Sequence, residues 1–402
     1  MSDMEYVKLK DVCSKIGSGS TPKGGASVYI EEGTSFIRSQ NVYNLSFSYK
    51  GLAHITEEAA YKLKGVTIKK NDVLINITGD SVARTCMVPD DVIPARVNQH
   101  VSIIRPNKEI LNPFYLSYYL ASPFMQATML NYAIGKGASR NAMTKEMIGK
   151  YLIPCPSTSV QSKIINVLKN YDNLIENNNK RIKLLEQMAE NLYREWFVRF
   201  RFPGYEDTEF EEKKPRGWQV GTDNKKNYVP TIFKYDEFRN IGSFIRGKNI
   251  TAANMIEGEI PVISAGIQPS GYHNEANIIG ASLTISASGA NAGYLQYHLN
   301  DIWAADCSYY QDEETIWFAY NTLKYLQPVI SNLQCGAAQP HVYPKNINRI
   351  YVLIPTMDLI KKYNEFVSPY YEEIRLLNKS NISLIKQRDY LLPRLMSGKL
   401  EV

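Results

Sequence analysis

The chain offers few combinations of residues that could carry out catalysis. The segment GSFIRGKN (242–249) approaches a nucleotide-binding P-loop, but Asn249 stands where that motif needs a hydroxyl for magnesium. The segment ASGANAG (287–293) is rich in glycine, but it lacks the spacing and the strand–helix setting of a dinucleotide-binding loop. No G-x-S-x-G motif is present, and the five histidines lack the spacing of metalloprotease ligands. The sequence therefore predicts no catalytic residue and no metal ligand.

The cysteines and the apolar residues indicate the compartment. The five cysteines are scattered without a C-x-x-C pair, which argues against a zinc site or a disulfide framework and favours a reducing cytosol. No run of 18 apolar residues occurs, so no membrane span is expected. The N-terminus lacks the apolar centre of a signal peptide. A cytoplasmic protein is predicted.

Charge is unevenly distributed along the 402 residues. The whole chain carries a formal net charge of +6, which by itself is a weak indication of an anionic partner. Residues 1–156 have a net charge of +5, whereas residues 235–355 have a net charge of −4. A nucleic-acid partner would therefore be easier to explain for the first region than for the second.

A repeat divides the chain into two similar halves. GASRNAMTKEMIGKYLIPCP (137–156) aligns without a gap with GAAQPHVYPKNINRIYVLIP (336–355), at an offset of 199 residues. Upstream, DVLINITG (72–79) matches ASLTISASG (281–289), and GTSFIRSQNV (33–42) matches GEIPVISAGI (258–267). Each of these upstream segments is typical of a strand that enters a polar loop. The same order in both halves predicts two copies of one strand-rich domain.

Each copy is followed by a long amphipathic segment. Apolar residues recur every three or four positions after Pro156 and again after Pro355, which predicts one apolar face on each of two long helices. Such helices can bury their apolar faces on each other, and Asn178 and Asn381 fall on these faces. Pro369 is expected to kink the second helix and Pro393 to end it.

The predicted fold class is α+β, with two pseudo-symmetric, strand-rich α/β domains and two long helices that pack on each other. The predicted boundaries follow the repeat. They are 1–156 for the first domain, 157–200 for the first helix, 201–234 for a linker, 235–355 for the second domain and 356–402 for the second helix with a C-terminal tail.

Several segments together resemble the specificity subunit of type I restriction–modification systems. They are VKLKDVCSKIGSGSTP, FIRSQNV, KKNDVLINITG, IPCP before a helix, LLEQMAENLYREWF, the linker FPG…PRGW and the terminal LLPRLMSGKL. The resemblance covers essentially the whole chain. It implies that each domain is a target recognition domain that reads one half of a bipartite, asymmetric DNA sequence. It also implies that the two domains are separated by the two long helices, which pack antiparallel as a coiled-coil spacer and set the gap between the halves.

The resemblance also implies partners. Two methyltransferase subunits are expected to flank this subunit, and motor and nuclease subunits to join for cleavage. S-adenosylmethionine, ATP and magnesium would be bound by those partners, and none is expected on this chain. Two alternatives remain open, namely a methyltransferase or nuclease that acts alone, and a coiled-coil scaffold with no role in DNA binding.

The candidate DNA-contacting residues are polar side chains in loops after predicted strands, because arginine can pair with guanine, and asparagine or glutamine with adenine. In the first domain they are Ser18, Ser20, Thr21, Lys23, Arg38, Gln40, Asn41, Asp80, Arg84, Arg96, Asn98, Gln99, Lys136, Ser139, Arg140 and Asn141. In the second domain they are Arg246, Lys248, Ser264, Gln268, Ser288, Asn291, Tyr309, Gln339 and His341.

Overall fold

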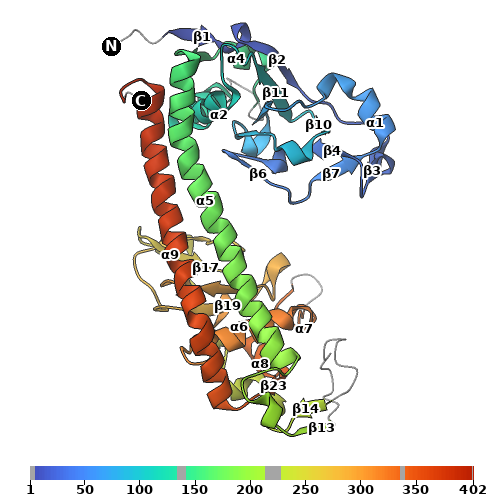
Figure 1. Ribbon diagram of the computed structural model, residues 1–402, viewed down its shortest axis with the longest axis vertical. Helices are drawn as coiled ribbons and strands as arrows, with labels where there is room; N and C mark the ends of the chain where they lie inside the picture. The colour runs from blue at the N-terminus through green and yellow to red at the C-terminus, as the bar shows by residue number, and fades with distance from the viewer. Residues whose placement is uncertain (1–4, 134–141, 213–227, 336–339, 401) are drawn as a thin grey trace. The chain divides into compact units, whose positions relative to one another are not determined.

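A computed structural model describes residues 5–133, 142–212, 228–335, 340–400 and 402. The chain divides into two compact units. Unit 1 comprises Met1–Glu176 and Ile382–Val402, and unit 2 comprises Asn177–Asn381. Each unit therefore contains one globular domain together with a part of both long helices (Figure 1).

The domain of unit 1 is built mainly from two four-stranded sheets. The first has the order β2-β11-β8-β9 and the second the order β10-β4-β7-β3. Its strands are β1 (Tyr6–Lys8), β2 (Cys13–Ser18), β3 (Tyr29–Ile30), β4 (Thr34–Ile37), β5 (Val42–Tyr43), β6 (Ser46–Phe47), β7 (Ala53–Ile55), β8 (Val73–Asn76), β9 (Thr85–Met87), β10 (Ala95–Val97), β11 (Val101–Pro106) and β12 (Leu152–Pro154). Its short helices are α1 (Glu57–Lys62), α2 (Pro113–Ala121), α3 (Pro123–Ala133) and α4 (Lys145–Gly149).

The domain of unit 2 repeats this plan. One sheet has the order β16-β22-β19-β20 and a smaller one the order β18-β17-β21. Its strands are β15 (Lys234–Glu237), β16 (Ile245–Arg246), β17 (Ile260–Ile263), β18 (Gly271–His273), β19 (Ser282–Ser286), β20 (Leu295–His298), β21 (Trp303–Ala304), β22 (Cys307–Tyr310) and β23 (Tyr351–Ile354), preceded by the pair β13 (Phe210–Glu212) and β14 (Tyr228–Pro230). Its short helices are α6 (Ile316–Tyr325), α7 (Gln327–Ser331) and α8 (Pro344–Asn348).

The pairing of the strands confirms the repeat that the sequence predicts. β8 and β19 are the matching central strands, and each pairs antiparallel with both of its neighbours. In each domain one parallel pair, β10 with β4 or β21 with β17, stands in the second sheet. A further antiparallel pair joins β1 to β12 and β15 to β23. The two domains therefore share one topology.

The burial of β8 explains the unbroken apolar run at residues 73–75 in this strand. Its side chains point alternately to the two faces of the sheet, as they do in any strand. Val73 and Ile75 pack with Tyr115 of α2, whereas Leu74 packs in a separate apolar cluster with Val97 of the second sheet. Because both faces are covered, the polar alternation of a half-exposed strand is absent.

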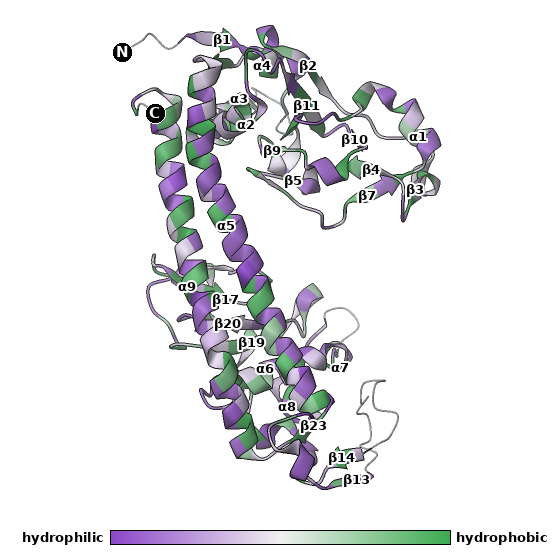
Figure 2. Cartoon of the chain, in the orientation of Figure 1, coloured by the Kyte–Doolittle hydropathy of each residue, from purple (hydrophilic) through white to green (hydrophobic). Residues whose placement is uncertain are grey.

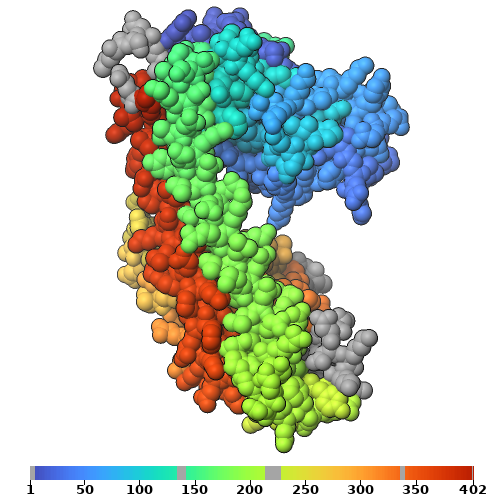
Figure 3. All heavy atoms as spheres, in the orientation of Figure 1, coloured from blue at the N-terminus to red at the C-terminus, as the bar shows by residue number. Residues whose placement is uncertain are grey.

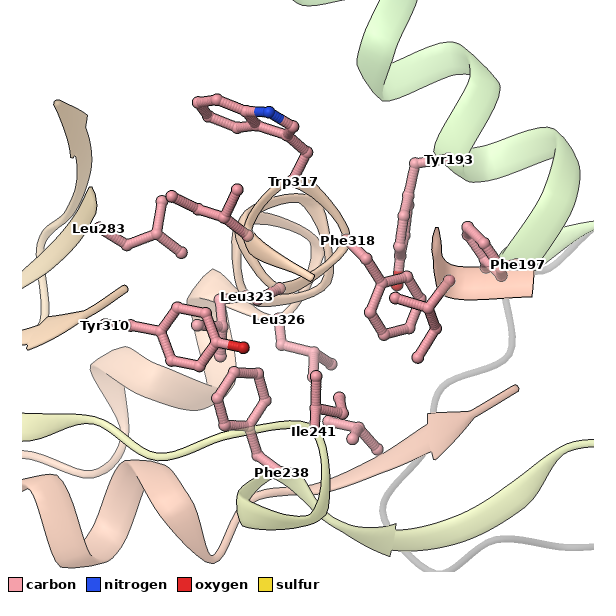
Figure 4. Close-up of a cluster of buried hydrophobic side chains, with 14 of the residues drawn as sticks. Tyr193, Phe197, Phe238, Ile241, Leu283, Tyr310, Trp317, Phe318, Leu323 and Leu326 are labelled. Carbon is pink, nitrogen blue, oxygen red and sulfur yellow. The ribbon is translucent and has the colours of Figure 1, made fainter. Parts of the chain in front are cut away.

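In unit 2, the corresponding layer of helix carries large aromatic side chains. Figure 4 shows Phe318 of α6 facing Tyr193 and Phe197, which come from the first long helix and its end. The ring centroids of Phe197 and Phe318 are 4.8 Å apart and the rings meet edge to face, an arrangement that aromatic pairs favour. On the other side of α6, Leu283 and Tyr310 extend from the sheet. The domain is thereby anchored to the long helix.

The two long helices are α5 (Thr158–Tyr193) and α9 (Met357–Met396), and a π-helical segment, Arg194–Val198, extends α5. Polar and apolar residues alternate along both helices (Figure 2), which lie side by side within each unit (Figure 3). α9 runs through Pro369 and through Pro393. The prediction that Pro393 ends the helix is therefore wrong. Pro393 lies in the last turn, where its carbonyl still accepts the amide of Ser397 at 3.0 Å.

Contacts within each unit show that the helices are antiparallel. In unit 1, the Arg388 guanidinium of α9 pairs with the Asp172 carboxylate of α5 at 2.7 Å. In unit 2, the Tyr363 hydroxyl donates to the Ala189 carbonyl at 2.9 Å. Positions that lie later on α5 thus meet positions that lie earlier on α9.

The two asparagines on the predicted seam meet each other. The Asn178 amide nitrogen donates to Oδ1 of Asn381 at 2.9 Å, and the Asn381 amide nitrogen donates to Oδ1 of Asn179 at 2.9 Å. Asn178 and Asn381 are both buried. A buried amide pair among apolar residues disfavours other alignments of two helices, since a shift would leave the amides without partners.

No helix of the described residues is long and apolar enough to cross a membrane.

Candidate nucleic-acid interface

A glycine directly follows the matching edge strand of the four-stranded sheet that contains β8 or β19. Gly19 follows β2, and Gly247 follows β16. A Cβ atom at these positions would lie 2.0 Å and 2.5 Å, respectively, from the nearest backbone oxygen, so only glycine fits without a shift of the backbone. The next amides, those of Ser20 and Lys248, donate to carbonyls at the ends of β10 and β21 at 3.0 Å and 2.9 Å. Each glycine therefore permits a close approach of two backbone segments, and the polar residues after it follow the same path in both domains.

A matching turn follows the central strand, β8 or β19, in both domains. Gly79 and Gly289 both have a φ of +74°, which is in the left-handed region that glycine tolerates best. The residue just before the turn carries a hydroxyl in both domains, Thr78 in the first and Ser288 in the second.

The repeated segment, whose two copies lie 199 residues apart, pairs with this turn in both domains. Thr78 forms a β-bridge with Ala142, and Ser288 forms one with His341. Ala142 and His341 are themselves separated by 199 positions. The repeat in the sequence thus corresponds to a segment that pairs with the turn after the central strand. Five of the predicted contact residues lie outside the described residues, namely Lys136, Ser139, Arg140, Asn141 and Gln339.

In the first domain, hydrogen bonds connect three loops through their side chains. The hydroxyl of Thr21 donates to Oε1 of Gln99. Nε2 of Gln99 lies 3.2 Å from Nε2 of His100, and Nδ1 of His100 lies 2.6 Å from Oγ1 of Thr78. The sequence predicted Thr21 and Gln99 as contacts, and the structure brings them together.

Arg38 and Gln40 occupy a different corner of the first domain. Nη2 of Arg38 donates to the carbonyl of Gly51 at 2.7 Å, and Nε2 of Gln40 donates to the same oxygen at 3.1 Å. The neighbouring Asn41 is completely buried and donates to the Ser48 carbonyl at 2.9 Å. In this conformation Asn41 stabilises the loop and presents no surface to a ligand.

Two of the predicted contact residues of the first domain, Arg84 and Arg96, interact with other parts of that domain. The guanidinium of Arg84 stacks over the ring of Tyr43 at 4.8 Å from its centroid. Nε of Arg96 donates to the Ala60 carbonyl at 3.0 Å, and burial lowers the pKa of the Arg96 guanidinium from its usual value. Asp80 is exposed in the turn after β8.

In the second domain, one carboxylate links two of the predicted contact residues. Nη2 of Arg246 donates to Oδ1 of Asp306, and the hydroxyl of Ser288 donates to Oδ2 of the same residue. Ser288 is buried, whereas the Arg246 side chain keeps 43% of its surface exposed. The Arg246 side chain is therefore partly open to solvent, while the Asp306 carboxylate holds its guanidinium.

Two further predicted residues of the second domain lie near aromatic or hydroxyl partners. The ammonium of Lys248 lies 5.8 Å from the ring centroid of Trp303, and the indole nitrogen of Trp303 donates to the Lys248 carbonyl at 2.9 Å. Oγ of Ser264 lies 3.0 Å from Oγ of Ser270.

Exposure separates the predicted contacts into three groups. Exposed residues are Ser18, Ser20, Thr21, Lys23, Gln40, Asp80, Gln99, Arg246, Lys248 and Gln268. Half-buried residues are Arg38, Arg84, Arg96, Ser264, Asn291, Tyr309 and His341. Buried residues are Asn41, Asn98 and Ser288. Oδ1 of Asn98 accepts a hydrogen bond from the amide of His100 at 3.1 Å, so this side chain also stabilises its own loop.

The sequence interpretation missed three residues at the centre of these loops: Thr78, His100 and Asp306. The amide of Ile77 donates to the His100 carbonyl, and the amide of Ala287 donates to the Asp306 carbonyl. His100 and Asp306 therefore occupy matching places. An alignment of NQHVS (98–102) with ADCS (305–308) would have shown the match, but it requires a one-residue gap that periodicity does not reveal.

The described residues contain no group of three or more His, Cys, Asp and Glu side chains that could hold a metal ion.

Comparisons with known proteins identify similar sequences over the whole chain. A family model described as the type I restriction modification DNA specificity domain matches residues 1–187 and 232–386. The chain is 28% identical to the type I restriction enzyme MjaIX specificity subunit of Methanocaldococcus jannaschii, with coverage of 100% of this chain and 94% of the relative. It is 21% identical to the HindI specificity subunit of Haemophilus influenzae, with coverage of 91% and 94%.

The fold is also similar to that of a solved structure. The crystal structure of the S subunit of a type I restriction–modification system from M. genitalium gives a TM-score of 0.55 at 17% identity. The match covers 98% of this chain and 97% of the other. At this identity the likeness shows a shared fold.

Proposed function

The chain belongs to the family of type I restriction–modification DNA specificity subunits, and from this premise we propose that its two domains each read one half of a bipartite DNA target. The first half is read by residues 1–156 and the second by residues 235–355. The remaining segments, 157–200, 201–234 and 356–402, are the first helix, a linker and the second helix with its tail.

The observation that carries this proposal is a common loop framework with different side chains in the two domains. The glycine turns and the bridges to the repeat segment match one another. The side chains at matching positions differ, however. Ser18 of the first domain corresponds to Arg246 of the second, and His100 corresponds to Asp306. A shared framework would approach DNA in the same way in both domains, while different donors and acceptors would select different bases. The two half-sites should therefore differ, and the target need not be a palindrome.

The proposed interface consists of the loop residues that keep exposed surface. In the first domain Thr21, Gln99 and Lys23 lead this group, and in the second Arg246 and Lys248 do so. The buried residues of the predicted set, Asn41, Asn98 and Ser288, position these loops and make no contact with DNA. The candidates outside the described residues, Lys136, Ser139, Arg140, Asn141 and Gln339, keep the role that the sequence predicts.

The long helices act as a ruler in this proposal. The antiparallel contacts and the buried pair of Asn178 and Asn381 support a defined alignment of the two helices. A fixed alignment would hold the number of unread base pairs between the half-sites constant.

The partners are two methyltransferase subunits and, for cleavage, motor and nuclease subunits. Exposed apolar side chains on the long helices, including Leu174, Leu184, Leu376 and Ile382, are compatible with docking of other subunits. In this proposal S-adenosylmethionine, ATP and magnesium are bound by the partners, and the chain acts in the cytoplasm.

Exchange of one domain tests the proposal. Residues 1–156 are replaced by the same region of a relative with a different target, and methylated sites are mapped across the genome of cells that express the complex. We expect one half of the target to change and the other half and the gap to stay the same.

The reciprocal exchange of residues 235–355 is the matched control, and it should change the other half alone. If either exchange alters both halves, the domains do not read independently. If methylation persists at the original sites after both exchanges, the domains do not read the DNA at all.

A further inference from the structure

We propose that Arg246 reads a guanine in the second half-site and that Asp306 is the positioning residue that makes this possible. The inference rests on the proposed function and deepens it by naming a base and the side chain that recognises it.

Asp306 is anchored through both oxygens of its carboxylate. This residue directly precedes β22, and its carbonyl accepts the amide of Ala287 at 3.3 Å. One carboxylate oxygen accepts the buried Ser288 hydroxyl, and the other accepts Nη2 of Arg246. Asp306 keeps only 26% of its side-chain surface exposed. The carboxylate is therefore fixed by the turn after the central strand and faces Arg246.

Arg246 keeps hydrogen-bond donors that Asp306 does not use. A guanidinium carries five N–H donors along two edges that can each form a pair of parallel hydrogen bonds. Nη2 contributes one hydrogen to each edge, so a single bond from Nη2 to Asp306 leaves the other edge complete. That edge matches O6 and N7 of guanine in the major groove. Because 43% of the Arg246 side chain is exposed, this edge can reach a ligand.

The first domain carries different side chains at the two matching positions. The position that matches Arg246 is Ser18, and the position that matches Asp306 is His100, whose Nδ1 contacts Thr78. In both domains, therefore, the hydroxyl of the residue before the turn at Gly79 or Gly289 contacts the side chain just before β11 or β22. In the second domain alone this contact continues to an arginine. The matched place therefore supports different base readers on one framework.

A phosphate contact is the alternative role for an exposed arginine, and the two roles predict different results. Lysine can replace arginine at a phosphate, but it lacks the planar fork that pairs with guanine. Loss of a negative charge at Asp306 should strengthen binding to any DNA, because phosphate attraction is independent of sequence. If Asp306 also orients Arg246, its loss should weaken the choice of base at one position.

The test uses the full chain in complex with the subunits that co-purify with it, and a DNA library with the second half-site randomised. Bound sequences are counted for the wild type and for Arg246→Lys and Asp306→Asn. For the wild type we expect a G·C pair at one position. Arg246→Lys should lower the preference at that position by roughly 10- to 100-fold. Asp306→Asn should weaken the same preference while it raises affinity for unrelated DNA.

Arg239→Lys is the matched control, because Arg239 lies in the same domain and pairs with Glu237 at 2.6 Å, but belongs to the segment next to β15. It should leave every base preference unchanged. A structural defect in Asp306→Asn would lower affinity for all DNA, the opposite of the expected rise. The inference is wrong if Arg246→Lys keeps the wild-type preference at every position. If the wild type selects no second half-site, the proposed function itself fails.

Discussion

An insertion in both long helices would test their role as a ruler. Four residues are added after Glu176 and, in the same variant, four after Asn381. These positions are the borders between the two compact units, so the contacts within each unit stay intact. At about 1.5 Å per residue the insertion adds roughly 6 Å, and at 3.6 residues per turn it adds a rotation of about 40° beyond one full turn.

The consequence for DNA follows from its own rise and twist. A base pair adds about 3.4 Å along the duplex and, at roughly 10 base pairs per turn, a rotation of about 35°. One added base pair matches the rotation and two match the rise, so we expect the unread gap to grow by one or two base pairs. Seven added residues give roughly 10 Å and a rotation about 20° short of two turns. That rise corresponds to about three base pairs, whose twist of about 105° the helices cannot match.

Mapping of methylated sites reads out both variants. The four-residue variant should methylate the same two half-sites at the longer gap, and the seven-residue variant should lose methylation. Four residues added to the 201–234 linker are the control, and the gap should then stay the same. Methylation at the original gap by the four-residue variant would refute the reasoning, as would full activity of the seven-residue variant.

Two further predictions concern individual residues. Gly19→Ala places a methyl group about 2.0 Å from a backbone oxygen, so the loop with Thr21 must move. Base selection at the first half-site should weaken, and the second half-site, measured in the same library selection, should be unchanged. Asp72→Asn removes the charge of a fully buried carboxylate that accepts Nε and Nη2 of Arg105, both at 2.7 Å. The free energy of unfolding of unit 1 should fall by about 3 kcal/mol in urea titrations, and an unchanged midpoint would show that the pair is not stabilising.

The larger features of the fold could be predicted from the sequence because they repeat or are periodic. The duplicated segments correctly indicated two domains of one topology, and the apolar periodicity correctly indicated two long helices. Asn178 and Asn381 could be placed on a common seam because periodicity fixes which residues share a face. Pro393 was misjudged, since a proline in the last turn removes only one backbone hydrogen bond and the helix can continue past it for a few residues.

The site could be predicted only in outline. Loops after strands could be found from turn residues, but the sequence does not tell which polar side chain in a loop faces inward. Asn41 and Ser288, for example, are of types that suit contacts with bases, but both are buried. Asp306 was overlooked because a lone aspartate before a strand has no distinguishing pattern. Its meaning depends on Arg246, which is 60 residues away in the chain and adjacent in the fold.

The central claim is that one chain reads two different half-sites through two copies of one loop framework. The most direct measurement is selection of bound DNA by the intact complex from a fully randomised library. We expect two short blocks of defined sequence that differ from each other and are separated by a constant number of unread positions. A single continuous block, two identical inverted blocks or a gap of variable length would contradict it.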